Sequence, residues 1–210
     1  MNFAVIIPDR GDRKQFFDHC LEQVAAFTLK PTFCYAVTYT PDSQEMDLTQ
    51  RIKAGVQQAK DDGIDLVFII ESDDNYPANY FERFEPYFVN YEFFGDDYST
   101  YYNLKNKPYR TWHHPGRASL FTTGFKISAL NQFNWPADNE RFLDIKLWQY
   151  AQRRKRKFVD TGAIGIKHGV GRTGGKGHFM RFKDVDVDLK FLREHTNGSF
   201  EFYKNIMQTL

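Results

Sequence analysis

Three acidic residues fall within four positions near the middle of the chain, directly after an apolar run. Residues 66–70 are rich in β-branched and aromatic side chains, which predicts a strand buried on both faces, and Glu71, Asp73 and Asp74 follow it. Carboxylates crowded at a strand end repel one another, and a hard cation such as Mg²⁺ or Mn²⁺ would offset this repulsion. The alternative is a solvated acidic turn in which Asp74 or Asn75 caps the next helix.

A second cluster of polar residues follows an apolar segment late in the chain. Residues 163–167 predict a strand, and residues 169–178 form a glycine-rich basic stretch. Glycine lets backbone N–H groups and basic side chains approach a phosphate closely, and such a loop can close over a bound ligand. The candidate phosphate ligands are Arg172, Lys176 and His178. A surface loop without a ligand is the alternative.

The two clusters lie in segments of opposite charge. Residues 61–97 carry eleven acidic side chains and one basic one, whereas residues 153–183 carry ten basic side chains and one acidic one. The net charge of +1 hides this asymmetry. An acidic centre followed by a basic arm suits a site that binds a metal and a polyphosphate together, although two solvated faces would give the same pattern.

The elements that must position these residues begin with a β-α-β-α-β order. Strands are predicted at residues 3–7, 33–40 and 66–70, and helices with apolar residues at three- and four-residue spacing lie between them. This order predicts a parallel sheet with helices on its faces. No G-x-G-x-x-G motif follows the first strand and no P-loop lysine motif occurs. If the protein binds a nucleotide, it must therefore use a different type of nucleotide-binding site.

The later elements are predicted from the same patterns. Two short strands are expected within residues 93–104, and an irregular stretch at 112–121 leads to a tight turn at 122–125 and a helix-like segment. Helices are expected at residues 79–88, 139–154, 187–194 and 200–207.

The bulk composition is that of a globular protein. With 210 residues, 41% of them hydrophobic and 26% charged, one domain with a substantial core is expected. No run of 18 apolar residues occurs, so no membrane-spanning helix is expected. The amino-terminal residues lack the basic start of a secretory signal, and the two cysteines imply no disulfide framework, so a cytoplasmic protein is expected.

Four features, in the right order and over most of the chain, resemble the GT-A glycosyltransferases, and in particular their family 2-like members. They are the segment 6–10, Arg51 with Gly55 and Ala59, the motif 71–76, and the segment 142–148 followed by 166–168. These enzymes use nucleotide sugars and carry a D-x-D-type metal site. The resemblance implies an α/β, Rossmann-like GT-A fold: a mostly parallel central sheet flanked by helices, with a small antiparallel acceptor-side sheet.

The resemblance also implies a donor site near the amino terminus. Pro8, Asp9 and Arg10 would hold the base and ribose of a nucleoside-diphosphate sugar, most simply a UDP-sugar, with Tyr39 as a further base contact and Arg51 facing the nucleotide. The alternatives are a surface salt bridge for Arg10, a core position for Tyr39 and a solvated helix position for Arg51.

In the acidic motif the resemblance implies separate roles for neighbouring side chains. Glu71 would face the ribose and Ser72 would be a further donor-binding residue, whereas Asp73 would bind an Mn²⁺ or Mg²⁺ ion that bridges the two phosphates, and His168 would complete the metal shell. The chain departs from a plain D-x-D at positions 71 and 72, so the division of roles within this motif stays open.

The catalytic base that the resemblance implies is Asp144, which matches the acidic residue at the start of the family's acceptor-side helix. In inverting members this residue takes the proton of the acceptor hydroxyl. The family more often shows Glu-Asp there, so Glu140 is a substitute, and Asp144 would position the acceptor in a retaining enzyme. As an alternative, Asp144 simply carries charge in the first turn of a helix.

The acceptor side is expected to include the residues Asp74, Trp112, His113, Arg117, Thr123 and Gly124. Residues 153–157 are five consecutive basic residues, which can meet a phosphate backbone or simply complement a helix dipole. Compact GT-A enzymes encoded by phages resemble this chain, and some glycosylate hydroxymethylated bases in DNA. A 5-hydroxymethylated pyrimidine is therefore the favoured acceptor, in the host cytoplasm if the chain is phage-encoded, and a glycan or lipid-linked saccharide is the alternative.

Within a single domain spanning residues 1–210, we expect a nucleotide-sugar-binding half at 1–104, an acceptor and catalytic half at 105–181, and a helical tail at 182–210. Two further functions fit the same pattern. A nucleotidyltransferase would share the order of elements and the acidic metal site, and a binding module would grip nucleotide sugars or nucleic acid without turnover.

Overall fold

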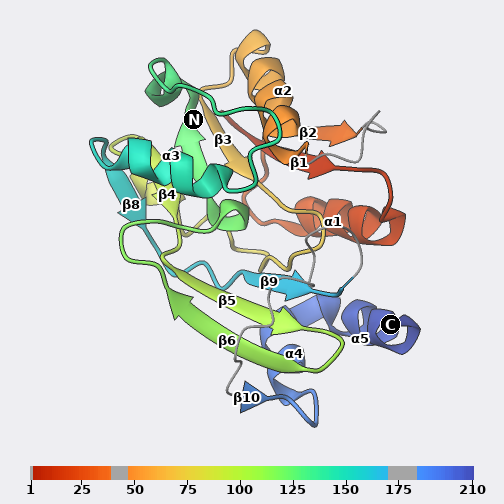
Figure 1. Cartoon of the computed structure of the whole chain (residues 1–210). Helices are drawn as coiled ribbons and strands as arrows, with labels where there is room; N and C mark the ends of the chain where they lie inside the picture. The colour runs from red at the N-terminus through yellow and green to blue at the C-terminus, as the bar shows by residue number, and fades with distance from the viewer. Residues whose placement is uncertain (1, 39–46, 170–183) are drawn as a thin grey trace.

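The computed structural model describes residues 2–38, 47–169 and 184–210 (Figure 1). Within them the chain is a mixed α/β fold with a central six-stranded sheet and a second, four-stranded sheet. The central sheet lies in the upper part of Figure 1 and the second sheet below it. The predicted fold class is confirmed.

The central sheet runs in the order β2-β1-β3-β7-β4-β8, and its strands are β2 (Phe33–Thr38), β1 (Phe3–Asp9), β3 (Leu66–Ile69), β7 (Gly124–Lys126), β4 (Phe93–Gly95) and β8 (Arg156–Phe158). β1 pairs in parallel with β2 and β3, and β4 with β8. β7 runs antiparallel to both of its neighbours. The carboxyl ends of β1, β2 and β3 therefore meet at one edge of the sheet, where open α/β sheets bind ligands.

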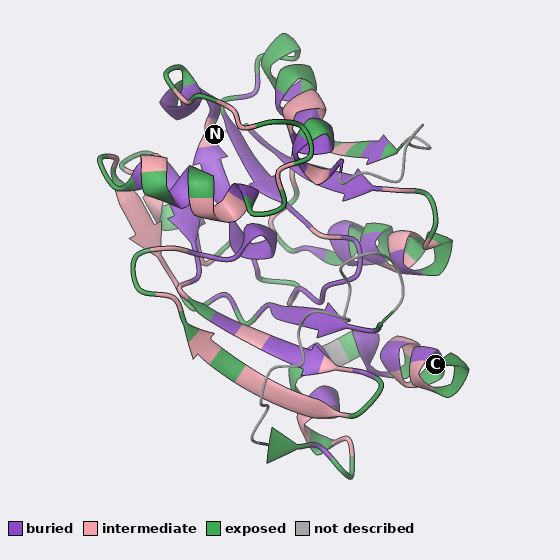
Figure 2. Cartoon of the chain, viewed as in Figure 1, coloured by how far each residue is buried: buried purple, intermediate pink, exposed green. Residues whose placement is uncertain are grey.

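Both faces of the four inner strands β1, β3, β7 and β4 are covered, as Figure 2 shows by their burial, whereas the edge strand β2 is largely exposed. Alternate residues of β1 and β3 point to opposite faces, so that Ala4 and Ile6 pack with α2 (Leu48–Asp61) and α3 (Leu143–Ala151). Phe3, Val5 and Ile7 pack on the other face, against α1 (Lys14–Ala26) and the aromatic segment 76–88. Continuous apolar strands are what a sheet covered on both faces requires.

The second sheet has the order β10-β6-β5-β9, with the strands β10 (Asp184–Val185), β6 (Pro108–His113), β5 (Tyr98–Asn103) and β9 (Ile164–Lys167). The helices α4 (Lys190–Thr196) and α5 (Phe200–Thr209) pack on it through Leu192 and Tyr203, and Phe16 of α1 joins the same cluster. Among the described residues no helix is long and apolar enough to span a membrane.

Three predicted segments take a different form. The helix expected at 79–88 is a series of turns with one short 3₁₀ helix, η1 (Glu85–Tyr87), because Pro86 has no N–H for a helical bond and Tyr80, Phe81 and Phe84 are drawn into the core. The turn expected at 122–125 contributes β7, which fills the centre of the sheet.

The third segment is the helix expected at 139–154, which spans only Leu143–Ala151. It starts later because residues 137–142 form turns: the Phe142 N–H donates to the Glu140 carboxylate (2.9 Å), and Thr49 Oγ1 donates to the Glu140 carbonyl (3.1 Å). The irregular stretch expected at 112–121 begins with the end of β6 and contains η2 (Leu120–Thr122); η3 (Ile127–Leu130) follows β7 as the helix-like segment.

Candidate active site at the end of strand β3

The acidic motif forms a turn that is fastened to two other elements. The backbone of Asn75 exchanges hydrogen bonds with Ile164 of β9 (both 2.9 Å), and Asp74 Oδ1 accepts the Ile166 N–H (2.7 Å). From α1, Gln23 Nε2 donates to the Asp74 carbonyl (3.1 Å), and Gln23 Oε1 accepts the Tyr76 N–H (2.8 Å). The turn is therefore not solvated, and the interpretation of Asp74 or Asn75 as a helix cap is wrong.

Three carboxylates of this turn gather in one place. Ligand oxygens of Glu71, Asp73 and Asp74 all lie within 4.8 Å of one another, and Asp74 is fully buried. Burial raises the pKa of Glu71 and of Asp74 above that of a free carboxyl, and the Asp73 charge raises both further. Such a cluster needs nearby positive charge to persist inside a protein.

Lys167, in β9, supplies one of the positive charges. Its side chain is almost entirely buried, with its ammonium nitrogen 5.2 Å from the centre of the Tyr101 ring. Burial alone would lower the pKa of Lys167, but the charges of Asp74, Asp73 and Glu71 raise it above the usual value. The lysine stays charged and holds the acidic turn against β9.

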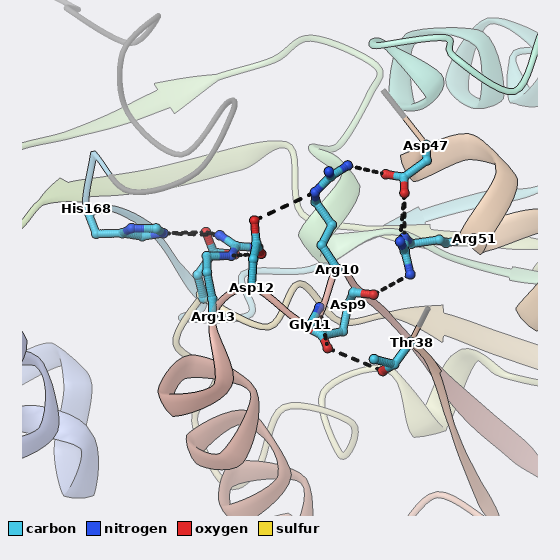
Figure 3. A network of polar contacts seen from close by, with 10 residues as sticks. Asp9, Arg10, Gly11, Asp12, Arg13, Thr38, Asp47, Arg51 and His168 are labelled. Atoms are coloured by element: carbon cyan, nitrogen blue, oxygen red, sulfur yellow. Dashed lines mark hydrogen bonds and ion pairs between the residues drawn. The ribbon is translucent and has the colours of Figure 1, made fainter. Parts of the chain in front are cut away.

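Arg13 and His168 meet at the Asp73 carboxylate. Figure 3 shows the Arg13 and His168 side chains pointing toward one another. His168 Nε2 lies 2.9 Å from Asp73 Oδ2, and Arg13 Nη1 lies 2.7 Å from the same oxygen and 3.2 Å from His168 Nε2. Burial works against the charged form of Asp73, but Arg13, the hydrogen bond with His168, and Lys167 together hold its pKa below the usual range. The structure thus brings the two predicted metal ligands together.

These residues fit a divalent cation. Carboxylate oxygen and imidazole nitrogen are ligands that Mn²⁺ accepts, and Asp73 with His168 offers one of each at 2.9 Å. Asp74 Oδ1 accepts the Ile166 N–H and the residue is fully buried, so Asp74 supports the turn; its place on the acceptor side stays a prediction. A cationic group, the Arg13 guanidinium, already lies at the pair.

The predicted nucleotide residues form a second network beside this cluster, in which Figure 3 shows Asp9, Arg10, Asp47 and Arg51 joined in series. Arg10 Nη1 donates to Asp47 Oδ1 (2.8 Å), and Arg51 Nη2 donates to Asp47 Oδ2 (2.7 Å). Arg51 also donates to the carbonyls of Asp9 and Val37, at the ends of β1 and β2. Arg51 is 1% exposed, so the solvated alternative is wrong and its role here is to join the two strand ends.

Several buried oxygens of this region have no hydrogen-bond partner among the described residues: Asp9 Oδ1, Ser72 Oγ, Asp74 Oδ2 and Asn75 Oδ1. Asp9 Oδ2 accepts the Gly11 N–H (3.0 Å) and the Thr38 hydroxyl (3.3 Å), but Asp9 Oδ1 has none, and neither has Ser72 Oγ. Buried polar atoms are normally satisfied, so Asp9 Oδ1 and Ser72 Oγ are available to a ligand at this end of the sheet. Pro8 is buried within β1 and shapes the strand end.

Four of the predicted donor residues, Tyr39, Arg172, Lys176 and His178, lie outside the described residues.

Asp144 lies in the first turn of α3, as predicted. Its Oδ2 accepts a hydrogen bond from Arg117 Nη1 (3.0 Å), and Arg117 Nη2 lies 3.0 Å from His114 Nδ1. Burial raises the pKa of Asp144, and the Arg117 charge opposes part of that shift. A half-buried carboxylate with a raised pKa is suited to accepting a proton near neutral pH.

Two residues predicted on the acceptor side instead connect α3 to β3. The Ile69 N–H donates to the Thr123 carbonyl (2.9 Å), and Trp148 Nε1 donates to Thr123 Oγ1 (3.0 Å). Trp148 is four residues after Asp144, hence on the same side of α3. Thr123 and Gly124 are buried in the core, where an acceptor cannot contact their side-chain positions, so this prediction is corrected.

The other predicted acceptor residues are exposed to different degrees on β6 and the loop after it. His113 stacks on the exposed ring of Tyr98 with a centroid distance of 4.4 Å, and its Nε2 lies 3.5 Å from Asp97 Oδ2. Trp112 is partly buried against Tyr101. Of this group, only Arg117 contacts the candidate base among the described residues.

The basic run at 153–157 is largely engaged within the protein. Arg154 Nη2 donates to the Tyr150 hydroxyl (2.5 Å), and Arg156 Nη1 donates to the Gly116 carbonyl (2.9 Å). The Lys157 ammonium lies 3.9 Å from the centre of the Tyr87 ring. Arg153 and Lys155 remain exposed.

Sequence reasoning missed Arg13, Lys167 and Gln23. Arg13 stands in the same polar loop as Arg10, and Lys167 directly precedes His168, so both were near predicted residues. No sequence pattern tells which arginine of a loop contacts a carboxylate 60 positions later. Nothing in the sequence singles out Gln23 as a functional residue, because it lies in an ordinary amphipathic helix.

No protein-family model and no curated protein matches the chain. Solved structures do match. S. aureus TarS, residues 1–349, aligns with a TM-score of 0.56 and 10% identity over 80% of this chain and 61% of that one. Its complex with UDP-GlcNAc aligns with a TM-score of 0.52 and 12% identity over 80% and 59%. The chain has a GT-A-like fold. It spans about three fifths of the TarS fragment's 1–349 length.

A third structure is a glycosyltransferase involved in the glycosylation of the major capsid of PBCV-1, with a TM-score of 0.38 and 12% identity over 73% of this chain and 68% of that one. The likeness to TarS establishes the fold. At 10% to 12% identity, residue roles rest on the geometry of this chain.

Proposed function

We propose that this protein is a metal-dependent glycosyltransferase that moves a sugar from a nucleoside-diphosphate sugar to a hydroxyl acceptor with inversion. The observation that carries the proposal is the Asp73–His168 pair, 2.9 Å apart at the carboxyl end of β3 in a GT-A-like fold. A solved structure of TarS holds UDP-GlcNAc, which supports a UDP-sugar as the donor.

In this reaction the acceptor oxygen attacks the anomeric carbon from the side opposite the diphosphate. A new C–O bond forms while the anomeric carbon–phosphate oxygen bond breaks, the nucleoside diphosphate leaves with the bonding electrons, and the acceptor proton passes to Asp144. Asp144 suits this role because its carboxylate is half-buried, its pKa is raised by burial, and Arg117 holds it by a 3.0 Å hydrogen bond.

The donor would bind along the carboxyl ends of β1 to β3, in the half of the chain at residues 1–104. Asp9 Oδ1 and Ser72 Oγ are two of the buried oxygens there that have no hydrogen-bond partner among the described residues, and Arg51 keeps the ends of β1 and β2 together. Asp73 and His168 would hold Mn²⁺ or Mg²⁺, which stabilises negative charge on the leaving diphosphate. Lys167 keeps the acidic turn in place.

For the acceptor we keep both predicted classes, a 5-hydroxymethylated pyrimidine in DNA and a glycan or lipid-linked saccharide. Three of the five basic residues at 153–157 are engaged within the protein, which weakens the argument for a DNA backbone. The exposed Tyr98–His113 stack offers aromatic area to a sugar or a base equally.

The proposal is tested with Asp73→Asn, which keeps the shape of the side chain and removes its charge. We expect donor cleavage, followed as release of nucleoside diphosphate, to fall about 100-fold or more, because the variant loses the anionic ligand of the ion. The control is Asp18→Asn, which removes an acidic group half exposed on α1, where it pairs with Lys14. Full activity in a folded Asp73→Asn protein would refute the site.

A further inference from the structure

The Arg13 guanidinium occupies one side of the Asp73–His168 pair, a side from which a metal ion could contact both ligand atoms. Its Nη1 is 2.7 Å from Asp73 Oδ2 and 3.2 Å from His168 Nε2, and these two atoms are themselves 2.9 Å apart. One nitrogen therefore lies within hydrogen-bond distance of both candidate ligand atoms. A divalent ion bound at about 2.1 Å from the same two atoms, on the side that Arg13 occupies, would overlap it.

Arg13 cannot make room by losing its proton. An arginine stays charged in proteins, and although burial alone would lower the pKa of Arg13, the Asp73 charge and hydrogen bond raise it. An ion can bind to the pair on the side that Arg13 occupies only if the Arg13 side chain moves. Two cations at one carboxylate would also repel each other strongly in a buried site.

The position of Arg13 gives its side chain another anion to bind. It is the residue at the start of α1, three positions after Arg10, so it follows the loop where the donor is proposed to bind (Figure 3). A diphosphate presents several charged oxygens, and a guanidinium binds phosphate through paired hydrogen bonds. A bound donor would thus offer Arg13 a replacement for Asp73.

We propose that Arg13 keeps the metal site closed in the nucleotide-free protein and moves to the diphosphate when the donor binds. The metal and the nucleoside diphosphate then bind cooperatively, each raising the affinity for the other. This inference rests on the metal site of the proposed function. A purely structural Arg13, which only neutralises Asp73, would instead give a variant without improved metal binding.

The test measures Mn²⁺ binding directly, from the electron paramagnetic resonance signal of free Mn²⁺, without any transfer reaction. Wild type, Arg13→Met and Lys14→Met are titrated with Mn²⁺ in the absence and presence of UDP, with UDP alone as a blank because it chelates Mn²⁺. Lys14 is the matched control: it is the next residue, it carries the same charge, and its side chain is 82% exposed. Thermal unfolding confirms that each variant is folded.

We expect UDP to tighten Mn²⁺ binding by wild type and by Lys14→Met about tenfold or more. Arg13→Met should bind Mn²⁺ about tenfold more tightly than wild type without UDP, and UDP should then add little. Equal or weaker Mn²⁺ binding by folded Arg13→Met would overturn the inference, while leaving the metal site intact if UDP-bound wild type binds Mn²⁺.

The inference can also be tested on the wild-type protein alone, without any substitution. If Mn²⁺ binds equally well with and without UDP, the proposed cooperativity is refuted even when Arg13→Met does not fold. If neither state of wild type binds Mn²⁺, both the inference and the metal dependence in the proposed function are wrong. These outcomes separate the two failures.

Discussion

At the scale of single residues, the contact between Arg117 and Asp144 predicts how the activity depends on pH. A base acts as its carboxylate, so activity rises with pH through the pKa of Asp144, which burial has raised and Arg117 partly lowers. Replacing Arg117 with Met removes the lowering charge, so the acidic limb of the kcat/KM profile should move to higher pH by about one unit. The measurement is the pH dependence of transfer.

The control for this prediction is Arg193→Met, which removes a basic charge on α4 whose guanidinium lies over the Phe200 ring. Its profile should match that of wild type. An acidic limb that stays in place in Arg117→Met would mean that another group, such as Glu140, accepts the proton.

At this scale, chemistry could be predicted where a residue type is rare and follows a strand. Asp73 and His168 are 95 positions apart in sequence; the acidic motif stood out by its place after an apolar run, the resemblance to GT-A glycosyltransferases implied both residues as metal ligands, and the structure brings them together. Arg13 and Lys167 were not predicted, because many basic residues could neutralise a carboxylate and only the fold selects among them.

At the scale of secondary-structure elements, the close approach of β7 to β3 predicts the effect of a substitution on the stability of the fold. A Cβ atom at Gly124 would lie 2.4 Å from ring atoms of Phe68, which is fully buried between neighbours that cannot easily move. Gly124→Ala should therefore lower the free energy of unfolding by about 1–3 kcal/mol, measured by urea denaturation.

Gly198→Ala is the matched control, since nothing lies within 4 Å of the place that an added methyl group would take and its backbone has no positive φ. It should unfold close to wild type. Equal stability of the two variants would show that β7 tolerates a wider separation from β3.

Elements could be predicted where a period or a run was long. The continuous apolar run of β1 and the apolar stripes of α1 and α2 predicted these elements, and all three are confirmed. β7 is three residues long and is a strand only because β3 and β4 pair with it on both sides. That is tertiary context, which local pattern does not contain.

For the whole molecule, the charge asymmetry of the chain has a partial structural explanation. β9 carries Lys167 and His168 from the basic segment directly against Glu71, Asp73 and Asp74 of the acidic segment. Within the described residues, Lys167 and His168 are thus the part of the basic segment that meets the acidic motif. The run 153–157 lies apart from this contact, at the end of α3 and in β8.

The whole-molecule fold was predictable because its β-α-β-α-β start constrains the topology, and the likeness to TarS at 10% identity confirms it. The acceptor was not predictable to the same degree. Acceptor recognition depends on the spatial arrangement of short, exposed segments such as Tyr98 and His113, which no spacing in the sequence determines.

The most direct test of the central claim is mass-spectrometric analysis of the nucleotide products. Wild type is incubated with Mn²⁺, a panel of nucleoside-diphosphate sugars, and acceptors that include hydroxymethylated DNA and glycans. We predict a nucleoside diphosphate together with a glycosylated acceptor for at least one pair. Pyrophosphate formed from a nucleoside triphosphate and a sugar phosphate would identify a nucleotidyltransferase, and binding without any product would identify a binding module. Either result would contradict the account.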